Sequence, residues 1–162
     1  MSRTLLATAS AVGALLLASA SSAVAQSPAT QTLTFKEVDQ GSTFAFVDNP
    51  PRAPRRHGAP THVSAGDFFV VSNRLVDAAG RPFGRLRAMC FVTEPGTPQN
   101  LHGDCFGVFS LPSGQLWGSG TTGPGLTTGA ILGGTGAYLN MHGTFVSKST
   151  RTGADDTVSL VG

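Results

Sequence analysis

The sequence lacks an excess of charge of either sign. Its 162 residues include 11 lysines and arginines and 9 aspartates and glutamates. Removing residues 1–25, as argued below, also removes Arg3, so the formal net charge becomes 10 minus 9, or +1. Proteins that bind nucleic acid through its phosphates carry a concentrated basic surface. The charge balance therefore argues against nucleic acid as a partner.

Helical patterning is also missing. Beyond residue 30, no stretch keeps apolar residues at three-and-four spacing over three turns. Glycine and proline, 21 and 10 residues of the chain, interrupt most windows that would otherwise suit a helix. We therefore expect an all-β fold.

Cysteine is scarce, and no Cys-His arrangement typical of a catalytic thiol is recognisable. The chain has only Cys90 and Cys105. In an exported protein, two cysteines usually form a disulfide. Such a bond would close a loop of about 15 residues and contribute about 3 kcal/mol in the chain-entropy model. We expect a Cys90–Cys105 disulfide, with a reactive thiol as the alternative.

Long hydrophobic runs are absent except at the amino terminus. Arg3 precedes an apolar run from Leu5 to Ala18, and Ala23-Val24-Ala25 has the small-x-small pattern cut by signal peptidases. A transmembrane anchor is the alternative, but the run is short for the ~20 residues that a bilayer requires. We expect a cleaved signal peptide at residues 1–25 and a secreted, extracellular domain at residues 26–162, with no membrane contact after cleavage.

The remaining chain alternates strand-like segments with turns. The expected strands are Thr32–Glu37, Ser42–Val47, Phe68–Asp77, Pro82–Thr93, Asp104–Leu111, Gln115–Gly120, Gly129–Leu132, Ala137–Lys148 and Asp156–Val161. A loop rich in proline and arginine occupies residues 48–63. Short connections favour antiparallel neighbours, and closure of the sheet removes exposed edges. The pattern predicts about eight strands in an up-and-down β-barrel.

Motifs of other protein classes are weak here. Gly118 to Gly123 spells a dinucleotide fingerprint, but Pro124 follows directly and no helix begins there. The four histidines show no close pair spacing on a predicted strand, so we expect no metal site. No Gly-x-Ser-x-Gly elbow occurs.

Polar residues inside predicted strands are the candidates for a site. Asn73 and Arg74 interrupt an apolar strand, and Asn140 and His142 share one face of a later one. Because side chains alternate across a strand, these residues either line the interior or form a solvated face. The sequence leaves both alternatives open.

Residues 131–138, Ile-Leu-Gly-Gly-Thr-Gly-Ala-Tyr, followed by Gly143-Thr144, resemble the signature hairpin of the allene oxide cyclase and dirigent superfamily. Gly66-Asp67-Phe68, Leu75–Gly84 and Asp156–Leu160 match bacterial members more loosely. The resemblance implies an eight-stranded antiparallel barrel with a mostly hydrophobic cavity, assembled as a homodimer or homotrimer, without a metal or organic cofactor. Members steer the cyclisation or coupling of reactive substrates by holding them in one conformer.

The resemblance also guides the choice of site residues. Dirigent proteins carry arginines after the signature turn, where this chain has Leu139 and His142. Asp48 resembles the acidic strand ends at the barrel mouth. We expect Asp48 and His142 to transfer protons, and Asn73, Arg74 and Asn140 to bind substrate, with Arg74 anchoring a carboxylate or oxyanion.

Three functions remain open at this point. The first is a secreted barrel that binds a small hydrophobic or oxygenated molecule and steers its cyclisation or isomerisation. The second is a non-catalytic binding protein with the same cavity. The third is a structural protein whose barrel is filled by side chains, namely Phe35, Phe44, Phe46, Phe69 and Trp117.

Overall fold

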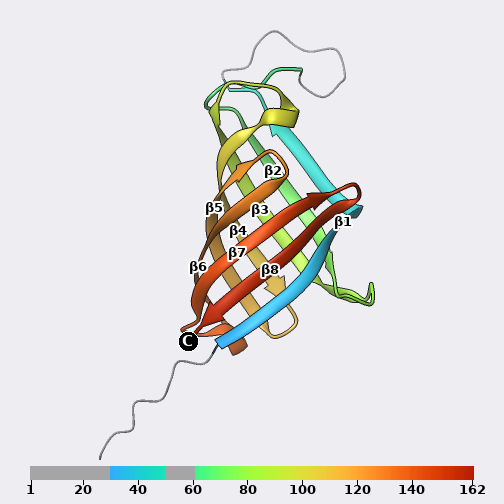
Figure 1. Ribbon diagram of the computed structural model, residues 1–162, viewed down its shortest axis with the longest axis vertical. Coiled ribbons are helices and arrows are strands. Elements are labelled where there is room, and N and C mark those ends of the chain that lie inside the picture. Colours follow the sequence, from blue (N-terminus) through green and yellow to red (C-terminus); the bar gives the residue numbers. More distant parts are fainter. Residues whose placement is uncertain (1–29, 50–60) are drawn as a thin grey trace, which may run out of the picture.

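Eight antiparallel strands close into one barrel (Figure 1). The structure, a computed structural model, describes residues 30–49 and 61–162, so the expected signal peptide and most of the proline- and arginine-rich loop lie outside the described residues. The strands are β1 (Thr30–Val47), β2 (Phe68–Val76), β3 (Pro82–Glu94), β4 (His102–Leu111), β5 (Gly114–Gly123), β6 (Leu126–Gly134), β7 (His142–Thr150) and β8 (Gly153–Val161). Each strand pairs with the next, and β1 pairs with β8. The predicted up-and-down barrel is confirmed.

Two short 3-10 helices, η1 (Pro98–Asn100) and η2 (Gly136–Tyr138), interrupt the connections between strands. No helix among the described residues is long and apolar enough to cross a membrane.

The first strand differs from the prediction. Two strands were expected, at Thr32–Glu37 and Ser42–Val47, and the structure has one strand in their place. β1 is continuous, with a register irregularity between Val38 and Thr43. The Ser42 hydroxyl stabilises this bulge because it donates to the Val38 carbonyl at 2.6 Å and accepts from the Arg74 amide at 3.0 Å. Residues 30–38 of β1 pair with β8, whereas residues 36–38 and, beyond the bulge, residues 43–47 pair with β2.

The seventh strand begins at His142 and not at Ala137 as predicted. The intervening residues form η2, which places Tyr138 against the barrel core with only 4% of its surface exposed. An aromatic ring at this position buries much more apolar surface inside the barrel than it would on an exposed strand. The Gly-Gly-Thr-Gly segment therefore ends β6 and turns the chain back across the barrel end.

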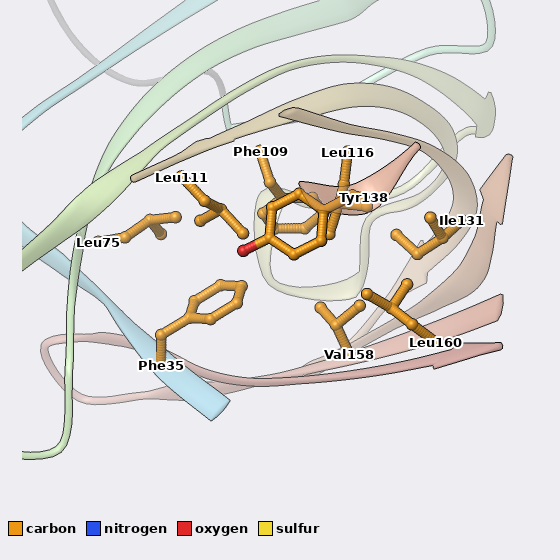
Figure 2. Packing of buried hydrophobic residues seen from close by; sticks show 9 residues of the cluster. All are labelled: Phe35, Leu75, Phe109, Leu111, Leu116, Ile131, Tyr138, Val158 and Leu160. Atoms are coloured by element: carbon orange, nitrogen blue, oxygen red, sulfur yellow. The ribbon is translucent and has the colours of Figure 1, made fainter. Parts of the chain in front are cut away.

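One half of the barrel is filled by a hydrophobic cluster (Figure 2). Its members are Phe35, Leu75, Phe109, Leu111, Leu116, Ile131, Tyr138, Val158 and Leu160. Of the five aromatic residues that a fully packed barrel was expected to use, only Phe35 belongs to this cluster, and Phe44 is 64% exposed. The other half of the barrel is therefore free to hold a site.

Candidate functional site

The unfilled half of the barrel contains a cavity of about 290 Å³. All eight strands contribute to its wall. A second recess, also about 290 Å³, shares Phe69, Thr122 and Ser149 with the cavity and extends to the β5–β6 turn at Pro124. The cavity thus opens toward this end of the barrel, at the lower limit of the size typical of small-molecule sites.

Small side chains create the space. Val71, Ala88, Gly107 and Gly118 are successive cross-strand partners on β2, β3, β4 and β5, and all four line the cavity. Gly129 makes room for an aromatic wall, because a Cβ atom there would lie 2.6 Å from the Phe145 ring. The glycines of the central strands therefore have a structural role in shaping the cavity.

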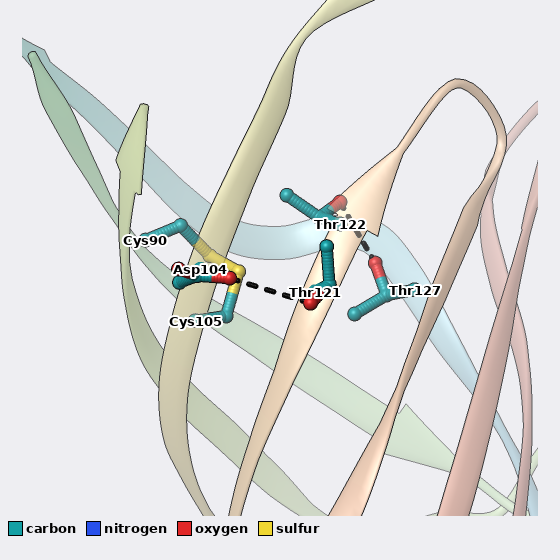
Figure 3. The surroundings of a disulfide bond; sticks show 6 residues. All are labelled: Cys90, Asp104, Cys105, Thr121, Thr122 and Thr127. Atoms are coloured by element: carbon teal, nitrogen blue, oxygen red, sulfur yellow. Dashed lines mark hydrogen bonds between the residues drawn. A yellow bond between two sulfur atoms is a disulfide. The ribbon is translucent and has the colours of Figure 1, made fainter. Parts of the chain in front are cut away.

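The predicted disulfide is confirmed. Cys90 and Cys105 are direct partners on β3 and β4, are bonded to each other and line the cavity (Figure 3). On the neighbouring wall, the Thr127 hydroxyl donates a hydrogen bond to the Thr122 hydroxyl at 2.9 Å. Figure 3 marks this hydrogen bond with a dashed line. The described residues include no free cysteine, so a reactive thiol is not part of the site.

A buried acidic pair lies on the inner face beside the filled half. Glu37 on β1 and Asp156 on β8 are 9% and 3% exposed. The Asn73 amide donates to Glu37 Oε2, and the Ser147 hydroxyl donates to Glu37 Oε1 at 3.4 Å. Ser147 is also the direct cross-strand partner of Asp156. Neither oxygen of Asp156 has a hydrogen-bond partner at standard distance and angle among the described residues.

Both acids hold their protons more tightly than usual. Burial raises the pKa of Glu37, and the hydrogen bonds from Asn73 and Ser147 act in the opposite direction. Burial, followed by the negative charge of Glu37, raises the pKa of Asp156 from 3.8 to about 8. Two neighbouring carboxyl groups in a poorly solvated site cannot both ionise readily. At neutral pH the pair therefore keeps a proton.

The raised pKa of Asp156 predicts how the free energy of unfolding depends on pH. Between pH 3.8 and about 8, folded Asp156 retains a proton that the unfolded chain releases. Its stabilising contribution is complete below this range and is lost as the pH rises through about 8. We expect Asp156→Asn to flatten the decline of unfolding free energy measured in urea from about pH 5 to about pH 8.5, and to be more stable than wild type at the upper end. 

The matched control is Asp155→Asn. Asp155 is exposed and lies 3.6 Å from Lys36 outside the barrel. This variant should keep the slope of the wild type. An unchanged slope in Asp156→Asn would show that the buried carboxyl group does not titrate as described.

The sequence-predicted site residues are not all near the cavity. Asn73 lines it, whereas the next residue, Arg74, is not among the lining residues. Asp48 directly follows β1 at the open end and is half-buried. Asn140 and His142 are exposed at the filled end, where His142 pairs with Val161. The structure thus brings Asn73 to the cavity and does not bring the five residues together.

The sequence reasoning missed Glu37 and Asp156. Both residues continue an alternating apolar series: Glu37 follows Leu33 and Phe35, and Asp156 precedes Val158 and Leu160. An acidic side chain in register with buried apolar ones is directed to the inside of a barrel. This signal was available in the sequence and could have identified the pair.

Comparisons with known proteins support the fold. No protein-family model and no curated protein matches the chain. Among solved structures, pyocyanin demethylase is 25% identical with a TM-score of 0.59, over 82% of this chain and 99% of that chain. A nonspecific heme-binding cyclase that catalyses [4 + 2] cycloaddition during neoabyssomicin biosynthesis is 17% identical, with a TM-score of 0.61 over 83% and 67% of the two chains. 

The pterocarpan synthase dirigent protein GePTS1 is 14% identical, with a TM-score of 0.56 over 85% of each chain. Together with the closed eight-stranded topology, these similarities show that the chain has an allene oxide cyclase/dirigent-like barrel. The expectation drawn from the glycine-rich hairpin is confirmed at the level of the fold.

Proposed function

We propose that this protein binds one small, largely hydrophobic or oxygenated molecule in the barrel cavity and steers its cyclisation or isomerisation. The observation that carries the proposal is a cavity that ends at a packed core and has a buried, proton-holding acid pair beside it. The similar structures include a cyclase and a dirigent protein, which supports this class of reaction.

The walls would supply the first part of the rate acceleration. Phe69, Phe109 and Phe145 are apolar and come from three different strands. A flexible substrate confined among them loses conformational freedom before it reacts, so a ring-closing conformer is reached at a smaller entropic cost.

The acid pair would supply proton transfer. Glu37, which lines the cavity, could accept a proton from carbon or oxygen of the substrate, and the acid pair could then return that proton to the ring-closed product. Asn73 donates to Glu37 and would hold that carboxyl group in position. The roles expected for Asp48, His142, Arg74 and Asn140 stay predictions, and this mechanism does not depend on them.

Export is part of the proposal. The signal-like amino terminus is its main support, and a disulfide is compatible with an oxidising compartment. The mechanism requires no metal or organic cofactor, and self-association as a dimer or trimer stays a prediction.

The test uses the small-molecule pool extracted from the culture of the protein's own host. Mature protein is incubated with this pool and then examined by native mass spectrometry, before and after organic extraction. We expect an adduct that extraction removes. Because ring closure by isomerisation conserves mass, the product should appear in liquid chromatography as a new peak of unchanged mass.

Glu37→Gln is the variant that separates binding from chemistry. At ligand concentrations that saturate its site, this variant should still carry the adduct and form the new peak more slowly by a factor of about 100, within the range typical of general acid–base catalysis. Absence of any adduct would overturn the proposal. If the wild type is saturated with ligand and carries the adduct but produces no new peak, the function is reduced to binding alone.

A further inference from the structure

The charges around the cavity all have the same sign. Glu37 and Asp39 line it, and Asp156 lies on the inner face next to Glu37. No lysine, arginine or histidine lines the cavity within the part of the chain that the structure describes. Among the basic side chains of the surrounding strands, Lys36 meets Asp155 on the outside and Arg87 is exposed. Arg74 is half-buried and its Nε atom has no hydrogen-bond partner among the described residues, but this side chain does not line the cavity.

Asp156 has no positively charged partner. It is almost fully buried, neither of its oxygens has a hydrogen-bond partner at standard distance and angle among the described residues, and the groups beside it are the acid Glu37 and the hydroxyl of Ser147. A buried carboxyl group in this situation either keeps its proton or acquires a positive partner, because an isolated buried charge is costly. The protein provides no cation in the cavity, so the positive partner would have to come from the ligand.

The aromatic walls favour the same kind of ligand. Phe109 and Phe145 line the cavity with their ring centroids 5.9 Å apart in an edge-to-face arrangement, and Phe69 lies on another wall. The faces of aromatic rings attract cations, and they also pack well against flat rings. Phenylalanine walls beside two acids therefore suit a flat body that carries a positive charge.

We propose that the ligand of this cavity carries a flat aromatic cation, a ring with a positively charged nitrogen that lies next to Glu37 and Asp156, joined to the flexible part that the proposed function cyclises. This inference rests on the proposed function because the ligand occupies the same cavity. It does not use the carboxylate or oxyanion that Arg74 was expected to anchor, since Arg74 does not line the cavity. Binding forms no covalent bond, and the proton of the acid pair leaves to solvent as the cation takes its place.

Proton release follows from the groups around Asp156. Glu37 faces it from β1, with Asp39 adding negative charge, Ser147 faces it from β7, and Asp155 adds negative charge from the outer face of β8. None of these groups is positive, so a cationic ligand is the main influence that would lower the pKa of Asp156. Cation binding should therefore become tighter as the pH rises toward 8.

Three probes of nearly the same shape test the charge preference. They are N-methylquinolinium, which is cationic, 1-methylnaphthalene, which is neutral, and 1-naphthoate, which is anionic. We expect equilibrium dialysis to show binding of the cation at least about tenfold tighter than binding of the neutral probe, with the anion weakest. Calorimetry of the cation in two buffers of different ionisation enthalpy should show net proton release, approaching one proton per ligand below about pH 8.

Variants assign the effect to the acid pair. Glu37→Gln and Asp156→Asn should each reduce cation binding about tenfold or more and leave the neutral probe within about twofold. The exposed control Asp155→Asn should retain the wild-type preference. Equal affinity of the wild type for cation and neutral probe would overturn the cation proposal and leave the proposed cavity function in place. No binding of any probe, together with no adduct from the host pool, would overturn both.

Discussion

Val71→Trp is expected to abolish occupancy of the cavity, with a loss of at least about 100-fold in affinity for both N-methylquinolinium and 1-methylnaphthalene. Val71 belongs to the row of small residues that keeps the cavity open. An indole at this position would occupy the space of the ligand. A factor of 100 corresponds to about 2.8 kcal/mol of lost binding free energy, which complete steric exclusion easily exceeds.

The neighbouring residue supplies a matched control. Val70 has the same side chain on the same strand, but it points to the outside, where it is 39% exposed and pairs with Met89. Val70→Trp should bind both probes within about twofold of the wild type. Equilibrium dialysis measures both variants, and circular dichroism with thermal melts verifies that each is folded. Undiminished binding by a folded Val71→Trp variant would mean that ligands bind elsewhere.

Gly153→Ala should destabilise the barrel by about 3 kcal/mol or more, in the range of overpacked cores combined with backbone strain. Gly153 begins β8 with a φ of 142°, in the region that favours glycine. A Cβ atom there would lie 1.9 Å from the carbonyl oxygen of Glu37. Because backbone must move to relieve this contact, the β1–β8 pairing that closes the barrel would be disturbed.

A second glycine tests whether the effect is specific. Gly133 in the signature hairpin has no atom within 4 Å of an added Cβ and does not have a positive φ. Gly133→Ala should therefore change the free energy of unfolding by less than about 1 kcal/mol. Urea denaturation at neutral pH measures both variants. Similar stability of the two would argue against close strand contact at Gly153.

The fold was largely predictable because its determinants are local. Alternating apolar residues and turn residues indicate strands and reversals within a few positions. The errors arose where a local pattern was ambiguous. Thr32–Glu37 and Ser42–Val47 looked like two strands because a bulge with Gly41 separates them. Residues 137–141 looked like part of a strand because the burial of Tyr138 is a tertiary effect.

The candidate site was much less predictable. Asn73 was recognised as a polar interruption of an apolar strand, and it lines the cavity. Asn140 and His142 had the same appearance in the sequence but lie at the filled end. Alternation indicates only that neighbouring side chains face opposite sides of a strand. It does not indicate which end of the barrel is packed and which end is hollow.

By itself, the sequence determined that this protein is a closed antiparallel barrel with one disulfide, because strand periodicity, turn residues and cysteine number depend little on distant parts of the chain. Only the tertiary structure decided where the chemistry lies. Closure of the barrel sets β1 beside β8, so Glu37 and Asp156, from opposite ends of the chain, share one poorly solvated site. Their altered pKa values arise from burial and mutual repulsion, and both effects exist only once the strands have assembled.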